Sequence, residues 1–210
     1  MKNKINIIGL SGKIGSGKTT FAEEFAKLSK IPVECHAFAD KLKELTQMLT
    51  GHKLTITNQP GKPFYNTVYN YTQEDKNVYL PTWDKTVGKC LQILGTEALR
   101  KGFDSDVWVK ALFESTAKEV LSNGHILVIA DVRFPNEADY ILKEGGILIR
   151  LIGDPMKIRE NSTRDLTHES EVALDNYTGF TEIIENDIPE LSKLHNKISS
   201  FMFKYNIPQF

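Results

Sequence analysis

Strand-like and helix-like patterns of apolar residues alternate along most of the chain. Short apolar runs predict strands at Ile5–Leu10, Pro32–Phe38, Ile126–Ala130, Ile147–Ile152 and Glu182–Ile184. Helical spacing predicts helices at Gly17–Leu28, Asp40–Leu49, Lys85–Lys101, Asp106–Leu121, Pro135–Lys143, Pro155–Asn161 and Pro189–Tyr205. Such alternation is typical of an α/β protein with a parallel sheet and helices on both faces.

Two segments break this alternation. Gly51–Trp83 is polar, rich in turn residues and aromatics, and too long for a simple connection. It fits either a flap that covers a substrate or a small subdomain at the edge of the fold. Asp154–Asn176 is rich in charge and carries Arg159 and Arg164 ahead of His168-Glu169-Ser170-Glu171. A charged run of this kind is often only a solvated face.

The first strand is followed by a complete phosphate-loop motif, G-x-x-x-x-G-K-[ST], which begins at Gly12. Its glycines let backbone N–H groups turn toward a polyphosphate, Lys18 supplies a cation for the β and γ phosphates, and Thr19 offers a hydroxyl to Mg²⁺. The positive end of the next helix points at the same anion. The residues expected to contact the phosphates are Gly12, Lys13, Gly15, Ser16, Gly17, Lys18, Thr19 and Thr20.

Composition narrows the class of partner. The 210 residues fit one domain with subdomains. Lys and Arg total 26 against 27 Asp and Glu, so the net charge of -1 gives no general attraction to a nucleic acid polymer or an anionic membrane. Cys35 and Cys90 have no C-x-x-C spacing, which argues against a disulfide framework or a zinc site. With no apolar run of membrane-spanning length, we expect a cytoplasmic protein.

A carboxylate and an arginine follow the third predicted strand. Asp131 comes directly after Ile126–Ala130, at the sheet edge where ligands of parallel sheets bind. Such an aspartate can hold Mg²⁺ directly or through water, or it can bond the turn before the Pro135 helix. Arg133 could reach a phosphate with its planar fork. It could equally form a structural salt bridge with Glu137.

Charged residues also follow the second predicted strand. Asp40 begins a helix that carries Lys41 and Lys43. Asp40 could orient a phosphorylated acceptor while one of the lysines meets its phosphate. It could also be only the cap of the helix.

Helical spacing places Gln92, Thr96 and Arg100 on one stripe of the Lys85–Lys101 segment. An amide, a hydroxyl and a guanidinium on one face could read a base and hold its phosphate, or they could be a solvated stripe opposite a leucine core. Trp108 follows a natural helix start and fits a core position better than a stacking platform.

Five segments together resemble the deoxynucleoside monophosphate kinases of the type found in large bacteriophages. They are Gly12–Thr19, Phe38–Lys43, Leu91–Glu97, Asp131–Glu137 and His168–Glu171, in this order along nearly the whole chain. One departure is the absence of an arginine ahead of Leu91-Gln92, where Lys85 and Lys89 stand. The insert Gly51–Trp83 matches nothing in the family residue by residue.

The resemblance implies a three-layer α/β/α P-loop kinase fold with a five-stranded parallel sheet. Its core would comprise residues 1–50, 124–153 and 177–210, with an insert for the nucleoside monophosphate at 51–123 and a lid at 154–176. It also implies transfer of the γ-phosphoryl group of ATP to a deoxynucleoside 5′-monophosphate with Mg²⁺, in a homodimer, in the host cytoplasm if a phage encodes it.

The resemblance assigns roles to residues. It implies that catalysis depends on Lys18, Arg133, Arg159 and Arg164. It also implies that Mg²⁺ is bound by Thr19 and Asp131, directly or through water. The residues that would bind the acceptor are Asp40, Lys41, Lys43, Gln92, Thr96, Arg100, Trp108, Arg133, Glu137 and Glu169.

Two other functions compete. A dephospho-coenzyme A kinase or a phosphomevalonate kinase would keep the fold and change the acceptor. A nucleotide-dependent switch would bind partners without processing a metabolite. A guanine-nucleotide switch needs an Asn-Lys-x-Asp base reader, and the stretch Asn196–Ser199 lacks the aspartate.

Overall fold

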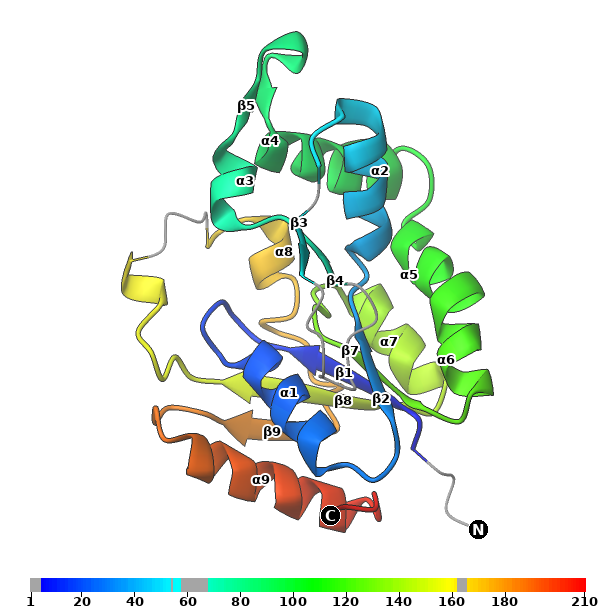
Figure 1. Ribbon diagram of the computed structural model, residues 1–210, viewed down its shortest axis with the longest axis vertical. Coiled ribbons are helices and arrows are strands. Elements are labelled where there is room, and N and C mark those ends of the chain that lie inside the picture. Colours follow the sequence, from blue (N-terminus) through cyan, green and yellow to red (C-terminus); the bar gives the residue numbers. More distant parts are fainter. Residues whose placement is uncertain (1–4, 54, 58–67, 162–165) are drawn as a thin grey trace. The chain divides into compact units, whose positions relative to one another are not determined.

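The computed structural model describes residues 5–53, 55–57, 68–161 and 166–210. The chain divides into two compact units, residues 1–35 with 119–210 and residues 36–118. The described strands of the first unit form a five-stranded sheet in the order β2-β7-β1-β8-β9 (Figure 1). These strands are β1 (Ile7–Ser11), β2 (Val33–His36), β7 (Ile126–Ile129), β8 (Ile147–Ile152) and β9 (Glu182–Glu185).

The sheet is parallel, as predicted. β1 pairs in parallel with β7 and with β8, and β8 pairs in parallel with β9. Every residue of β1 and β7 is buried, as expected for central strands whose two faces are both covered. The carboxyl ends of these strands therefore lie at one edge of the sheet, where the loops after them can build a site.

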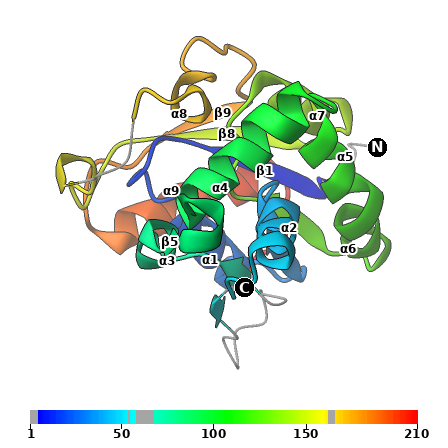
Figure 2. The same ribbon diagram turned by 90° about the horizontal axis from the view of Figure 1, so that it is seen from above.

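Helices cover both faces of this sheet (Figures 1 and 2). On one face α1 (Lys18–Leu28) packs against α9 (Leu191–Lys204) through Phe21, Phe25 and Phe201, whose rings are 6.2–6.3 Å apart. On the other lies α7 (Pro135–Lys143). Gly9 lets it approach, because a Cβ there would lie 2.6 Å from Ile141 Cδ1. The three-layer α/β/α prediction is confirmed.

The second unit is mostly helical. Its α-helices are α2 (Asp40–Thr50), α3 (Gln73–Asn77), α4 (Val87–Gln92) and α5 (Val107–Leu112), with π-helical turns η2 (Ile93–Lys101) and η3 (Phe113–Ala117). Short antiparallel pairs join β3 (Thr55–Thr57) to β4 (Val68–Asn70) and β5 (Tyr79–Leu80) to β6 (Lys85–Thr86), with the 3-10 turn η1 (Pro81–Trp83) between β5 and β6. α6 (Lys118–Ser122) follows η3 along the chain.

The helix predicted at Lys85–Lys101 differs in two ways. It begins at Val87, because Lys85 and Thr86 pair as a strand and the Thr86 hydroxyl caps the helix by accepting the N–H of Lys89 at 3.2 Å. From Ile93 it is a π-helix. Sequence periodicity does not distinguish the two windings, since residues four apart remain neighbours in both.

The helix predicted at Pro155–Asn161 is wrong. Only a 3-10 turn, η4 (Arg159–Asn161), forms there. The Asp154 carboxylate accepts the N–H groups of Ile158 at 2.9 Å and Arg159 at 2.8 Å. An aspartate that bonds nearby backbone in this way competes with a helix. A short helix that the sequence patterns did not predict, α8 (Glu169–Val172), follows in the same segment.

Within the part of the chain that the structure describes, no helix is both long enough and apolar enough to span a membrane.

Candidate functional site

The loop after β1 has the backbone of a phosphate cradle. Gly12, Gly15 and Gly17 take φ angles of 154°, 80° and 88°, which residues with a Cβ rarely adopt. α1 begins directly after Gly17, so its unpaired N–H groups and the positive end of its dipole face the loop. The local sequence alone explains this geometry, because glycines stand where the chain turns left-handed.

Lys18 folds back over this cradle. Its Nζ donates hydrogen bonds to the carbonyl oxygens of Gly12 at 2.7 Å and Lys13 at 3.0 Å. The ammonium is thereby held at the mouth of the loop. Thr19 and Thr20 are exposed at the start of α1. Their position fits hydroxyls that reach an anion or its metal ion.

Ser16 and Asn186 hold the loop on its buried side. Ser16 is fully buried, and its Oγ has no hydrogen-bond partner among the described residues. Asn186, which follows β9, donates from Nδ2 to the carbonyl oxygen of Ser16 at 3.0 Å. A Cβ at Gly17 would lie 2.4 Å from that Nδ2. Asn186 was not among the predicted site residues, although its place directly after a strand at the ligand-binding edge of the sheet was a usable signal.

A cavity of about 410 Å³ adjoins the loop. Gly15, Gly17, Lys18, Thr19 and Thr20 form its polar side. Apolar side chains line the remainder, namely Ile14, Pro155, Met156, Ile158, Ile188, Pro189, Leu191 and Leu194, together with Asn186 and Glu190. An anion cradle that continues into an apolar slot suits a nucleotide, whose phosphates are charged and whose base is flat and largely apolar.

Arg159 lies against the phosphate loop. Its Nε donates to the carbonyl oxygen of Ile14 at 2.9 Å, and its Nη2 contacts the carbonyl oxygen of Gly153. Asp154 fixes the turn that carries this arginine. The backbone N–H of Arg159 keeps the pKa of Asp154 below its ordinary value, against the opposing effect of desolvation. Arg164, the second arginine predicted here, lies outside the described residues.

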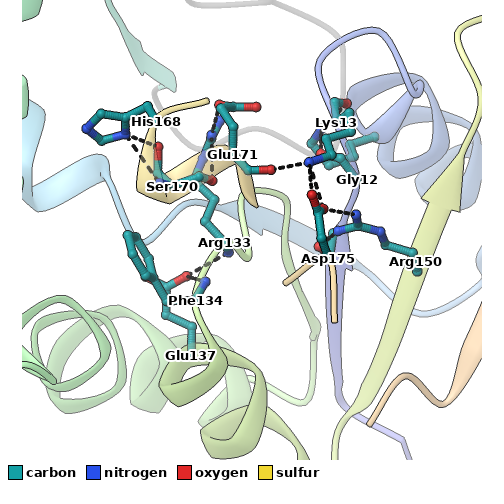
Figure 3. A network of polar contacts seen from close by, with 12 residues as sticks. Gly12, Lys13, Arg133, Phe134, Glu137, Arg150, His168, Ser170, Glu171 and Asp175 are labelled. Atoms are coloured by element: carbon teal, nitrogen blue, oxygen red, sulfur yellow. Dashed lines mark hydrogen bonds and ion pairs between the residues drawn. The ribbon is translucent and has the colours of Figure 1, made fainter. Parts of the chain in front are cut away.

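Arg133 is held at both ends (Figure 3). Its backbone N–H donates to Glu137 Oε2 at 2.8 Å, and the N–H of Phe134 donates to the same oxygen at 3.1 Å. Its guanidinium pairs with Glu171 and donates to the carbonyl oxygen of Ser170 at 3.4 Å. Glu137 is 2 % exposed and acts on the backbone of this turn. Asp131 lies in the same turn, two residues after the end of β7, and is half-buried.

Two further charged residues at this edge were not predicted as part of the site. Asp175 binds Lys13 Nζ at 2.6 Å and Arg150 Nη2 at 3.2 Å (Figure 3). The hydrogen bond from Lys13 is the main cause that lowers the pKa of Asp175. Arg150, on β8, also donates to Ser11 Oγ at 3.0 Å. Because these residues come from distant parts of the chain, no local sequence motif predicts that they lie together.

His168 and Glu169 begin α8. His168 Nδ1 accepts the N–H of Ser170 at 3.2 Å and so caps this helix. Glu169 is exposed in the first turn. Its predicted contact with the acceptor stays a prediction.

Most of the predicted acceptor residues lie in the second unit, namely Asp40, Lys41, Lys43, Gln92, Thr96, Arg100 and Trp108. Asp40 is the first residue of α2; its carboxylate accepts the N–H of Ala37 at 2.8 Å and pairs with Lys43 at 3.0 Å. Lys41 pairs with Glu44 at 2.9 Å. These contacts build the start of α2, and the predicted contact of Asp40 and the lysines with a substrate stays a prediction.

The stripe of Gln92, Thr96 and Arg100 spans α4 and η2. Thr96 is 8 % exposed, so the stripe is not simply solvated. Gln92 accepts from Lys89 at 3.2 Å, and Arg100 donates to the carbonyl oxygen of Ser105 at 3.2 Å. Trp108 is 6 % exposed and donates from Nε1 to the carbonyl oxygen of Gly95 at 2.9 Å. These contacts favour the core position for Trp108.

Comparison with solved structures finds distant likenesses. A sugar kinase from Janibacter sp. HTCC2649, solved without ligand, is 17 % identical, with 98 % of this chain and 96 % of that chain covered and a TM-score of 0.48. Shikimate kinase from Acinetobacter baumannii in complex with shikimate is 14 % identical, with 97 % and 96 % covered and a TM-score of 0.45.

Comparison by sequence is more specific. The model of the family "Deoxynucleotide monophosphate kinase" matches residues 35–198. A curated protein of Acanthamoeba polyphaga mimivirus, named "Putative deoxynucleotide monophosphate kinase", is 30 % identical over 197 residues, which cover 86 % of this chain and 88 % of the relative. The chain therefore belongs to the deoxynucleotide monophosphate kinase family, which is a family of phosphotransferases.

Proposed function

We propose that the protein transfers the γ-phosphoryl group of ATP to a deoxynucleoside 5′-monophosphate and releases ADP and the deoxynucleoside diphosphate. The observation that carries the donor half is the phosphate cradle with Lys18 at its mouth and a cavity of about 410 Å³ beside it. Family membership supports the acceptor half.

The donor would lie with its phosphates on the loop and its base in the apolar slot. Backbone N–H groups from Gly15 to Thr19 would bind the β and γ phosphates, and Lys18 would exchange its contacts with Gly12 and Lys13 for phosphate oxygens. This exchange costs little, because the ammonium gives up two neutral carbonyl acceptors for charged ones.

The residues present also suit Mg²⁺. Thr19 is exposed beside Lys18, and Asp131 follows β7 at the same edge of the sheet. Mg²⁺ in kinases is usually held by one or two protein oxygens together with phosphates and waters. A hydroxyl and a carboxylate are thus a sufficient protein contribution. When bound by Thr19 and Asp131, the ion would neutralise charge on the phosphates.

Charge neutralisation and positioning carry the chemistry. The attacking phosphate oxygen of the acceptor is already ionised, so a general base is not needed. Arg159 and Arg133 would stabilise the charge that spreads over the transferring group, with Arg164 as a third cation. Arg159 already contacts the loop through Ile14.

The acceptor would bind the insert, residues 51–123, together with Asp40, Lys41 and Lys43 at the start of α2. Gln92, Thr96 and Arg100 would read the base and hold its phosphate, and Glu169 would add a contact from α8. The lid, residues 154–176, would exclude water, since ATP would otherwise be hydrolysed.

A coupled assay of ADP release across all deoxynucleoside and ribonucleoside monophosphates tests this function. Dephospho-coenzyme A and phosphomevalonate serve as the competing acceptors. We expect at least one deoxynucleoside monophosphate to accelerate ADP release far above hydrolysis without acceptor. Turnover of either competing acceptor, with none of the deoxynucleoside monophosphates active, would contradict the proposal.

A further inference from the structure

Cations from three adjacent strands converge on one short segment (Figure 3). Lys13 follows β1, Arg133 follows β7 and Arg150 lies near the end of β8, and these strands are neighbours in the sheet. All three side chains bind residues 170–175, which comprise most of α8 and the turn after it. We call this segment the α8 clip. The segment carries the carboxylates of Glu171 and Asp175. Next to a site for phosphates these carboxylates would repel the substrate, so a structural role has to explain their presence.

Glu171 is the central residue of the clip. Its carboxylate, 4 % exposed, pairs with the guanidinium of Arg133. Its backbone carbonyl oxygen accepts a hydrogen bond of 2.5 Å from Lys13 Nζ. One residue thus ties the loop after β7 to the phosphate loop after β1.

The ion pair of Glu171 differs from that of Asp175 in its exposure to water. The Asp175 carboxylate is 40 % exposed, so solvent screens its pairs with Lys13 and Arg150. The Glu171 carboxylate is shielded from water, so its attraction to the Arg133 guanidinium is screened much less. Of the two carboxylates, Glu171 therefore restrains its cation more strongly.

Arg133 keeps donors for a second partner while it is restrained. Its contacts with the described residues Glu171 and Ser170 both use Nη1, and a guanidinium has five N–H donors in a fixed fork. Its backbone is held separately by Glu137. An arginine side chain loses rotamer entropy when it is fixed in one orientation. Restraint before the substrate arrives removes part of that cost from the reaction.

We propose that Glu171 is a positioning residue that holds the guanidinium of Arg133 in the orientation in which it meets the phosphate. The inference rests on the proposed role of Arg133 in phosphoryl transfer. Glu171 itself touches no substrate; it acts through Arg133, and the helix cap at His168 fixes its own place.

A double-mutant cycle tests this role. Arg133→Ala, Glu171→Gln and the double variant are compared for kcat and for the KM of ATP, with folding checked by thermal unfolding. Glu171→Gln should lower kcat about 10- to 100-fold with little change in the KM of ATP, because misplacement of a catalytic group by about 1 Å costs up to about 100-fold. In the Arg133→Ala background it should cause no further loss, since the residue that it positions is gone.

Two further variants separate positioning from simple charge or stability effects. Glu144→Gln removes an exposed carboxylate at the end of α7 and should leave kcat unchanged. Glu171→Asp keeps the charge and should recover part of the activity lost in Glu171→Gln, whatever the stability of that variant.

The outcomes distinguish this inference from the proposed function. If Arg133→Ala keeps normal kcat, the proposed role of Arg133 is wrong. If Arg133→Ala loses activity while Glu171→Gln does not, or if the two losses multiply in the double variant, the positioning role alone is overturned.

Discussion

The Nε of Arg159 donates a hydrogen bond of 2.9 Å to the carbonyl oxygen of Ile14. An arginine from the segment after β8 thereby lies on the phosphate loop after β1. The turn that presents it is fixed by Asp154, whose carboxylate packs beside Gly15. The Arg159 side chain thus lies directly beside the residues that we expect to bind the phosphates.

Arg159→Ala should lower kcat about 10- to 1,000-fold and raise the KM of ATP much less, because removal of one charge-stabilising donor acts mainly in the transition state. Steady-state ADP release checks this. Lys157→Ala removes an exposed cation from the same turn and should change neither constant. Equal losses of kcat in Arg159→Ala and Lys157→Ala would show that Arg159 contributes only through the general positive charge of this turn.

Lys18→Ala should abolish most turnover even at saturating ATP, with a loss of at least about 100-fold, since its ammonium is held at the mouth of the loop. Far-UV circular dichroism should remain unchanged, because Lys18 is the first residue of α1 and alanine is a good helix former. Lys30→Ala provides the matched control away from the loop. Near-normal kcat in Lys18→Ala would remove this lysine from the mechanism.

Asn186→Ala should weaken ATP binding and destabilise the protein together. The Ser16 carbonyl oxygen loses its donor at a buried site, which costs about 1–3 kcal/mol. Urea unfolding and ATP titration measure the two effects. Asn196→Ala, on an exposed position of α9, should have neither. Unaltered ATP affinity in Asn186→Ala would show that the loop keeps its shape without this residue.

Trp108→Phe decides between the core and stacking interpretations of this residue. It removes the hydrogen bond to the buried carbonyl oxygen of Gly95, so we expect a loss of about 1–3 kcal/mol in the free energy of unfolding. The KM of the acceptor should stay within about twofold of the original. A large rise in that KM with unchanged stability would instead support a stacking platform.

The ion pairs of Asp175 predict a dependence of stability on pH. Lys13 lowers the pKa of Asp175 below its ordinary value of 3.8 in the folded state. The carboxylate therefore stabilises the fold above about pH 4, and this stabilisation disappears as the pH falls through the lowered pKa. The free energy of unfolding of the original protein should exceed that of Asp175→Asn at pH 6, and the difference should shrink toward pH 2. A difference that is constant across this range would contradict the ion pairing.

The sequence by itself determined the fold class and the phosphate-loop motif. Apolar runs at β1, β7 and β8 predicted buried parallel strands, because a strand covered on both faces has no polar side to alternate with. The phosphate loop was recognisable because its glycines, Lys18 and Thr19 act within eight successive residues. The family resemblance, which the comparisons confirm, also depended on such local segments.

Other features depended on the tertiary structure. The turn at Asp154 replaced a predicted helix, because one carboxylate captured two backbone N–H groups. The pairing of Arg133 with Glu171 and of Asp175 with Lys13 joins residues 38 and 162 positions apart. Asn186 supports Ser16 across 170 positions. Periodicity and motifs report interactions between near neighbours in the chain, whereas folding alone decides which distant charges share one edge of the sheet.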